Sequence, residues 1–185
     1  MDEQEIVAEA QTDGSTPFVD GENGGTASAL YLDDLRVGQR FTSGSLRIEE
    51  AEIKAFAAQF DPQPFHLDEA AARASLFGGL AASGWHTAAL SMRLMVDGGL
   101  PIAGGLIGAS GELAWPRPTR PGDVLTVETE VLEIVPSKSR PDRGFATLRS
   151  ATRTQTGEPV QIFTMKLTIP RRPERTSVGG SGEAA

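Results

Sequence analysis

A helix without a polar face most constrains what this chain can fold into. The run WHTAALSMRLMV, inside a helix expected from about residue 84 to 97, is apolar or small nearly all round, and Arg93 is its one certain charge. Such a helix is enclosed by other elements and does not lie on a surface. We therefore expect the rest of the domain to be built around residues 84–97.

Four segments after this helix are typical of β-strands, because they carry β-branched residues in partial alternation between turn signals. They cover residues 106–115, 123–135, 144–155 and 160–169. A short strand is also expected over residues 39–48. Helices followed by consecutive strands favour an antiparallel α+β sheet packed on helices. The simplest such architecture that encloses an apolar helix is a curved antiparallel sheet wrapped around it.

Two shorter helices are expected between the first strand and the central helix. An amphipathic helix over residues 49–60 is predicted by apolar residues at the i, i+3, i+4, i+7 spacing of a core-facing stripe. This stripe consists of Ile53, Phe56, Ala57 and Phe60. A brief helix over residues 69–75 follows, with Asp68 as its N-cap. Between them, Pro62 and Pro64 argue against any regular helix, so a stiff, kinked connector is expected.

The composition indicates one folded domain between two polar tails. A chain of 185 residues with 39% hydrophobic content suits a single core, which we place in residues 29–172. Residues 1–28 and 173–185 are polar and rich in glycine and serine, with too little apolar surface to offset the entropy of ordering. Both segments are therefore predicted to be disordered tails, the first of them acidic.

Charge and residue usage also exclude several classes of protein. A net charge of −8 argues against a nucleic-acid surface, and no apolar run approaches the length of a membrane span. The N-terminus lacks the basic start and apolar run of a signal peptide, so a cytoplasmic protein is expected. The absence of cysteine excludes disulfides, thiolate metal sites and a cysteine nucleophile.

The connector carries the candidate catalytic pair, Asp61 and His66, one of only two histidines in the chain. Five residues apart on a straight helix, these side chains would diverge, whereas on a kinked connector they can converge. A carboxylate and an imidazole in one cleft are a standard pair for moving protons to and from water. Because Asp61 follows a predicted helix C-terminus, we expect it to bind protons more readily than a free carboxylate.

Four segments resemble the MaoC-like dehydratases, hotdog-fold proteins that include the (R)-specific enoyl-CoA hydratases. They are residues 61–68 (DPQPFHLD), 76–84 (LFGGLAASG), 115–118 (WPRP) and 120–123 (RPGD). The resemblance spans roughly residues 33–170 and implies a hotdog fold and a hydratase or dehydratase that needs no cofactor.

The resemblance also implies roles for particular residues. Asp61 and His66 fall on the family's catalytic aspartate and histidine, and Gly84 on the glycine whose amide is assigned to the oxyanion hole. Gln63 stands where an asparagine is usual and Ser83 where a histidine is usual, so both are candidate substrate-positioning residues. The residues themselves favour the same role for Gly84. If Ser83 caps the central helix, the Gly84 amide lacks an intrahelical partner and can stabilise developing negative charge.

Basic residues near the predicted site have two possible roles. Arg117, Arg140 and Arg143 form either a solvated rim or a grip for the phosphates of coenzyme A, to which arginine is well suited. The expected ligand is therefore an acyl-CoA or acyl-carrier-protein thioester.

A single curved sheet leaves edge strands uncovered, so we also expect a homodimer with the acyl tunnel at the interface.

Other functions and sites remain open at this stage. Thioester hydrolysis on the same fold is disfavoured, because hotdog thioesterases generally resemble one another in an acidic residue within the central helix, and only Asp97, at its far end, is available. A non-catalytic acyl-thioester-binding subunit is the remaining alternative.

No metal site is expected, because the candidate ligands match no common spacing. The second histidine, His86, is expected to be buried or at an interface. We expect the following large apolar side chains in the core: Trp85, Met92, Met95 and Trp115.

Overall fold

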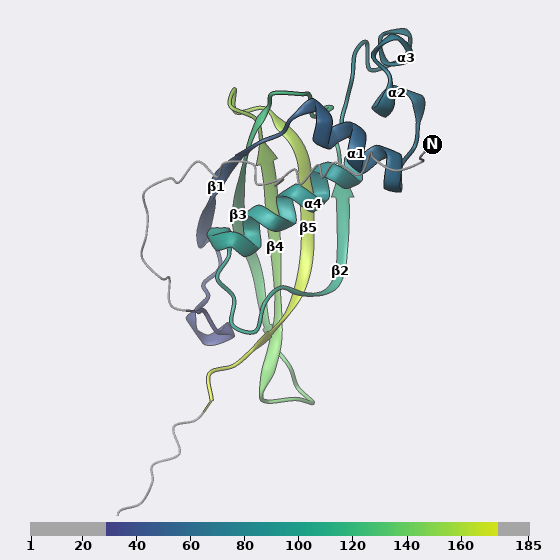
Figure 1. The fold of residues 1–185 in the computed structure, drawn as a ribbon. Coiled ribbons are helices and arrows are strands. Elements are labelled where there is room, and N and C mark those ends of the chain that lie inside the picture. Colours follow the sequence, from purple (N-terminus) through teal and green to yellow (C-terminus); the bar gives the residue numbers. More distant parts are fainter. Residues whose placement is uncertain (1–28, 174–185) are drawn as a thin grey trace, which may run out of the picture.

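One antiparallel sheet curves around a single helix in the computed structural model, which describes residues 29–173 (Figure 1). The strands of this part of the chain are β1 (Arg40–Arg47), β2 (Ile107–Ala114), β3 (Val124–Pro136), β4 (Arg143–Arg153) and β5 (Pro159–Pro170). Their order across the sheet is β1-β3-β4-β5-β2, so β1 and β2 form its two edges. The predicted hotdog architecture is confirmed, with strand bounds within a few residues of those expected from the sequence.

The helices precede the four consecutive strands, as predicted. They are α1 (Glu50–Phe60), α2 (Pro64–Leu67), α3 (Glu69–Ala74) and α4 (Gly84–Leu94). A 3₁₀ turn, η1 (Leu32–Asp34), comes before β1, and a π-helical turn, η2 (Met95–Gly99), continues α4. Helices α1, α2 and α3 gather at one end of the sheet, beside the start of α4 (Figure 1).

The connector between α1 and α3 is more regular than its prolines suggested. Residues Pro64–Leu67 form helix α2, with Pro64 in its first turn, so the expectation that no regular helix forms there was wrong. Proline is well tolerated at that position, because its missing N–H has no intrahelical acceptor and its fixed φ suits a helix. Pro62 still separates α1 from α2 and gives the connector its kink.

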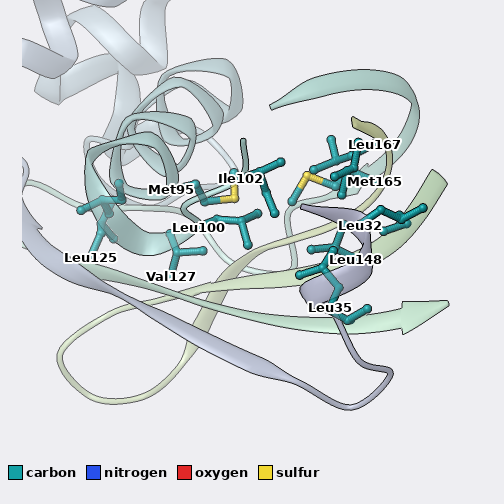
Figure 2. Packing of buried hydrophobic residues seen from close by; sticks show 14 of the residues in the cluster. Leu32, Leu35, Met95, Leu100, Ile102, Leu125, Val127, Leu148, Met165 and Leu167 are labelled. Carbon is teal, nitrogen blue, oxygen red and sulfur yellow. The ribbon is translucent and has the colours of Figure 1, made fainter. Parts of the chain in front are cut away.

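The main core lies between α4 with its continuation and the concave face of the sheet (Figure 2). Buried and more accessible residues alternate along β4, where Ala146 and Leu148 point inward. Met95 and Leu100 meet them from the helical side, and Met165 and Leu167 from β5. Each large apolar side chain buried in this way contributes about 1.5–3 kcal/mol relative to exposure. This packing fixes α4 against the sheet and so fixes the position of its N-terminus.

Helix α4 is covered on only one side within a single chain, which corrects the expectation of a fully enclosed helix. His86, Thr87, Ser91 and Leu94 are buried against the sheet or α1. On the opposite face Trp85 is 63% exposed and Val96, in η2, is 61% exposed. A single five-stranded sheet covers one side of a helix, and nothing within residues 29–173 covers the other.

Buried hydroxyl groups join the covered side of α4 to strand β4 and to the loop before β3. Ser91 Oγ lies 2.7 Å from Thr152 Oγ1 of β4, and Thr87 Oγ1 donates to Thr119 Oγ1 over 2.9 Å. Because each of these buried hydroxyl groups has a hydrogen-bond partner, burying them on the core-facing side of the helix costs little free energy of folding. They also set the rotation of α4 more specifically than apolar contacts alone.

Several expected core residues are instead at the surface. Of the predicted α1 stripe, Ile53 and Ala57 are buried, but Phe60 is 63% exposed at the helix end. Trp85, Met92 and Trp115 are exposed, and of the four large side chains assigned to the core only Met95 is buried. His86 is buried, as predicted.

The predicted tails, residues 1–28 and 173–185, lie outside the described part of the chain, except for residue 173. Across residues 29–173, none of the helices has the length and apolar character that crossing a membrane requires.

Candidate active site

The structure brings Asp61 and His66 together at the junction of α1 and α2. Asp61 Oδ2 lies 3.4 Å from Nε2 of His66, and both side chains are largely shielded from solvent. Asp61 caps the C-terminus of α1, and His66 lies in the single turn of α2. The kink at Pro62 turns α2 back towards the end of α1, which is why residues five positions apart can face one another.

The orientation of the His66 ring is set by a backbone carbonyl. Its Nδ1 lies 2.7 Å from the carbonyl oxygen of Ala81, which can only accept a hydrogen bond. Nδ1 must therefore carry the proton in this contact, so that Nε2 is the ring nitrogen available for proton exchange. That atom is the one that faces Asp61.

One neutral donor binds the Asp61 carboxylate: Gln63 Nε2 donates to Asp61 Oδ1 over 2.7 Å. Burial raises the pKa of Asp61, but the Ser83 hydroxyl, the Gln63 amide and the nearby His66 together outweigh it and hold the pKa below its usual value of 3.8. The expectation of raised proton affinity was therefore wrong, because the polar and charged neighbours favour the ionised carboxylate more than burial disfavours it.

Gly84 is the first residue of α4, and Ser83 is its N-cap, as predicted. Ser83 Oγ accepts a hydrogen bond from the Trp85 amide at 3.2 Å. The amide of a first-turn residue has no acceptor within its own helix, so the Gly84 N–H is left to a ligand or to water. At this end of α4 the helix dipole favours negative charge.

A cavity of about 1260 Å³ connects these groups. Its lining consists of Asp61, Gln63, Phe65, His66, Ala74, Ser75, Leu76, Phe77, Ala82, Gly84, Trp85, Thr87, Trp115, Pro116, Arg117, Pro118, Thr119 and Arg120. The proton-transfer pair and the start of α4 thus open on one space, whose remaining walls are largely apolar and aromatic. Such a cavity suits a ligand with an apolar body and one polar reacting group.

Aromatic residues that the sequence analysis assigned to the core form part of this wall. The rings of Trp85 and Trp115 meet edge to face, with centroids 5.4 Å apart. Trp115 Nε1 donates to Oε1 of the buried Gln161 over 3.0 Å, which anchors the indole. A tryptophan at the end of a strand and directly before Pro116 was the available signal that it serves a loop and not the core.

Arg120 is a further residue of the site whose role the sequence did not indicate. Its guanidinium donates to the carbonyl oxygens of Phe77, Gly79 and Leu80. It therefore ties the loop before α4 to the loop before β3. The same loops are joined by the Ala82 amide, which donates to the Thr119 carbonyl over 2.9 Å.

The three arginine residues predicted to bind phosphate lie in two separate places. Arg117 lines the cavity and is ion-paired with Glu158 at its rim. Arg140 and Arg143 belong to the β3–β4 hairpin, at the opposite end of the sheet (Figure 1). The 13 residues of β3 separate the two ends, by about 40 Å at the usual rise per residue. Arg143 is paired there with Asp142, and neither hairpin arginine lines the cavity.

Within residues 29–173 no cluster of three or more histidine, cysteine or acidic residues is placed to hold a metal ion. The described side chains of this site can transfer protons. They do so beside a backbone N–H group, that of Gly84, which can donate a hydrogen bond to developing negative charge.

Comparison with known proteins defines the class. The family described as MaoC like domain matches residues 35–152, and the chain belongs to this family. A solved structure of a MaoC-like dehydratase from Rhodospirillum rubrum is 66% identical and superposes with a TM-score of 0.77, covering 78% of this chain and 99% of that one.

Two curated relatives are similar along most of the domain. An uncharacterised protein of Bacillus subtilis, YdeM, is 32% identical over 141 residues, covering 76% of this chain and 97% of its own. A 3-hydroxybutyryl-CoA dehydratase of Methylorubrum extorquens is 33% identical over 117 residues, covering 60% of this chain and 69% of its own. Membership of the MaoC-like family agrees with the resemblance seen in the sequence motifs.

Proposed function

We propose that this protein is a hydro-lyase that adds or removes water across the double bond of a 2-enoyl thioester. The observation that carries the proposal is the convergence of Asp61 Oδ2 and His66 Nε2, 3.4 Å apart, on the cavity that also contains Gly84 at the start of α4. The similarity to a 3-hydroxybutyryl-CoA dehydratase supports the same reaction class.

In the hydration direction, a water molecule is held between Asp61 and the Nε2 atom of His66. Asp61 is ionised at neutral pH, because its pKa is held low, and so can accept a proton from this water. The water oxygen then bonds to the β-carbon, and the π electrons move onto the thioester oxygen. The Asp61–His66 pair returns one proton to the α-carbon, which completes the addition of H and OH. Dehydration is the reverse of these steps.

The enolate-like oxygen is the charge that the site must stabilise. We assign this role to the Gly84 amide, whose position at the start of α4 combines a free N–H with the positive end of the helix dipole. A preorganised donor of this kind contributes about 2.7–4 kcal/mol to transition-state stabilisation in well-studied acyl-transfer sites. Gln63 contributes by holding Oδ1 of Asp61, which leaves Oδ2 directed at His66.

We further propose that the thioester is carried by coenzyme A or an acyl-carrier protein, with Arg117 at the rim of the cavity binding its phosphate. Roles for Arg140 and Arg143 in phosphate binding require a ligand that reaches them from the cavity of a second subunit. The proposed assembly is a homodimer, supported by the exposed face of α4 and by the uncovered edge strand β2. Since Trp85 belongs both to that face and to the cavity wall, the acyl tunnel would lie at the subunit contact.

Neither alternative function gains support from a specific contact. Asp97, the acidic residue that a thioesterase mechanism would need, lies in η2, is paired with Arg93 at 3.3 Å and does not line the cavity. A non-catalytic binding subunit would have no need of the close approach of Asp61 Oδ2 to His66 Nε2 at the cavity.

The proposal is tested with purified protein and a panel of short and medium 2-enoyl-CoA thioesters. The absorbance of the conjugated thioester and the release of free thiol are followed in parallel. We expect absorbance to fall to an equilibrium value without thiol release. Thiol release would instead establish hydrolysis, and ligand binding without either change would establish a binding subunit.

A further inference from the structure

Arg120 is partly buried in the wall of the cavity, where its guanidinium is hydrogen-bonded to the backbone. Its Nη1 donates to the carbonyl oxygens of Gly79 and Leu80 over 2.6 and 2.9 Å, and its Nη2 donates to that of Phe77. Three bonds from one planar fork need the guanidinium geometry, which a lysine ammonium does not reproduce. The three acceptors belong to residues 77–82, between α3 and α4, which we call the strap.

The turn that carries Arg120 is itself fixed to the rest of the domain. The Arg120 amide donates to Oδ2 of Asp123 over 2.7 Å, which closes the turn 120–123. The carbonyl of Ile48 accepts from the Gly122 amide, and its amide donates to the Asp123 carbonyl. Ile48 is fully buried. Arg120 therefore holds the strap from a point whose own position is set by the core.

The strap contains the carbonyl that orients His66. The Ala81 oxygen lies 2.7 Å from Nδ1 of the imidazole. The residue before it, Leu80, is bound through its carbonyl to Arg120. The residue after it, Ala82, is bound through its amide to the loop before β3. The Ala81 carbonyl is thus fixed from both sides.

The imidazole of His66 lies between two acceptors that compete for its proton. The Ala81 carbonyl faces Nδ1 at 2.7 Å and the Asp61 carboxylate faces Nε2 at 3.4 Å. The neutral ring carries one proton, so the nearer and better fixed acceptor takes it and Nε2 keeps its lone pair. In that form Nε2 can accept a hydrogen bond from the reacting water, whose other hydrogen can go to Asp61. If the Ala81 carbonyl moved away, the carboxylate would draw the proton to Nε2 and close that place to water.

We propose that Arg120 is a positioning residue, which keeps the Ala81 carbonyl on Nδ1 of His66 and so keeps Nε2 open to water. In this role Arg120 acts through the strap and the imidazole, not on the reacting atoms. Three of the five N–H groups of its guanidinium already have carbonyl acceptors, which leaves it poorly placed to bind a phosphate instead. The consequence for catalysis rests on the proposed function, whereas the effect on the protonated nitrogen of His66 does not.

The first measurement needs no substrate. Nitrogen NMR of the full chain, labelled at histidine, reports which ring nitrogen carries the proton at a pH where both imidazoles are neutral. The chain has only one other histidine, His86, and His66→Ala assigns the signals. We expect His66 to be protonated at Nδ1 in the unmodified protein and largely at Nε2 in Arg120→Ala and Arg120→Lys. Protonation at Nε2 already in the unmodified protein would overturn the inference.

Kinetics with a 2-enoyl-CoA separate positioning from ligand binding. Arg120→Lys should lower kcat about tenfold to a hundredfold, as a small misplacement of a catalytic group does, with little change in KM. A phosphate-binding role would instead raise KM in Arg120→Ala, keep kcat, and be largely retained by lysine. Guanidinium ion at millimolar concentration should restore part of kcat in Arg120→Ala, because the ion can bind the carbonyl groups that the side chain has left.

Arg153 is the matched control. It is a partly buried arginine whose Nη1 donates to the Gly157 carbonyl over 2.9 Å, and it does not line the cavity. Arg153→Ala should lower the melting temperature without changing the His66 tautomer or kcat. Should Arg120→Ala fail to fold, Arg120→Gln takes its place, because the amide keeps two donors but not the fork.

The outcomes distinguish this inference from the proposed function. Retention of the Nδ1 proton of His66 in the Arg120 variants would overturn the inference and leave Arg120 as a tie between two loops. A normal kcat despite a changed tautomer would overturn it as well. A changed tautomer in a protein that hydrates no thioester would support the role of Arg120 and refute the proposed reaction.

Discussion

The indole of Trp115 lies directly over Gly84, so closely that a methyl group on Gly84 would be 2.7 Å from Cε2 of the ring. The glycine is required by this contact and not by its backbone conformation, since the positions with positive φ lie elsewhere in the described chain. Because Gln161 anchors Trp115 from the core, the ring cannot easily move aside. The start of α4 is thereby held at a fixed distance from the aromatic wall of the cavity.

Gly84→Ala should therefore both destabilise the protein and impair activity. Overpacking of this kind costs about 1–3 kcal/mol, and displacement of the helix start moves the proposed oxyanion donor. Unfolding by denaturant and steady-state kinetics measure the two effects. Gly44→Ala is the control, because nothing lies within 4 Å of a methyl group there. Normal kinetics in Gly84→Ala would show that the added methyl group does not displace the start of α4, contrary to the contact with Trp115.

His86 should make the protein less stable below about pH 6.5. Its ring is stacked on Phe56 with centroids 4.6 Å apart, and its buried Nδ1 has no hydrogen-bond partner among the described residues. Burial lowers the pKa of His86 from 6.5, although Glu52 opposes the shift. The unfolded chain therefore binds a proton first as the pH falls through 6.5, and stability declines from there to the lower folded pKa.

Replacing this histidine tests that assignment. His86→Phe should remove the decline in the free energy of unfolding between pH 7.5 and 5.5 (about one unit either side of the unperturbed pKa). It should raise the free energy of unfolding at neutral pH by about 1 kcal/mol, because an unsatisfied buried nitrogen is lost. Urea unfolding at the two pH values gives both quantities. An equal decline in the variant would assign the pH dependence to other groups.

The exposed face of α4 should be covered by a second copy of the chain. We expect a stable dimer at micromolar concentration by light scattering, and a shift to monomer in Val96→Glu, which places a charge on that face. Val37→Glu is the matched control, because Val37 is 65% exposed but lies in the turn before β1. A monomeric unmodified protein would contradict the proposed assembly, and so would a Val96→Glu protein that remains dimeric.

The sequence was sufficient for the architecture, because strand patterns, turn signals and an apolar helix each constrain the fold locally. It also placed Ser83 as a helix cap and Gly84 as the first residue of α4. The kinked connector allowed Asp61 and His66 to meet, and the structure brings them together.

The sequence was less informative where an environment depends on distant residues. The downward shift of the Asp61 pKa depends in part on the hydroxyl of Ser83, 22 residues away, which no local sequence pattern reveals. Apolar character alone could not separate Met95, which is in the core, from Trp85, which forms part of a cavity wall. No local pattern predicted that the Arg120 guanidinium would donate to the carbonyl oxygens of Phe77, Gly79 and Leu80.

The central claim is that Asp61 activates water, and Asp61→Asn tests it most directly. The amide keeps the shape of the side chain and removes the basic carboxylate. Stability should fall slightly at neutral pH, because a carboxylate with a lowered pKa stabilises the fold above pH 3.8 and loses that effect as the pH falls. His66→Ala should reproduce the catalytic loss, and the double variant should lose little more, since both groups act on one water.

The decisive measurement is kcat for enoyl-thioester hydration in Asp61→Asn beside Asp142→Asn, a matched change on the distal β3–β4 hairpin. The account predicts a fall of about 10²–10⁴ in Asp61→Asn and an unchanged rate in Asp142→Asn. A folded Asp61→Asn protein with the full rate of the unmodified enzyme would contradict the proposed mechanism.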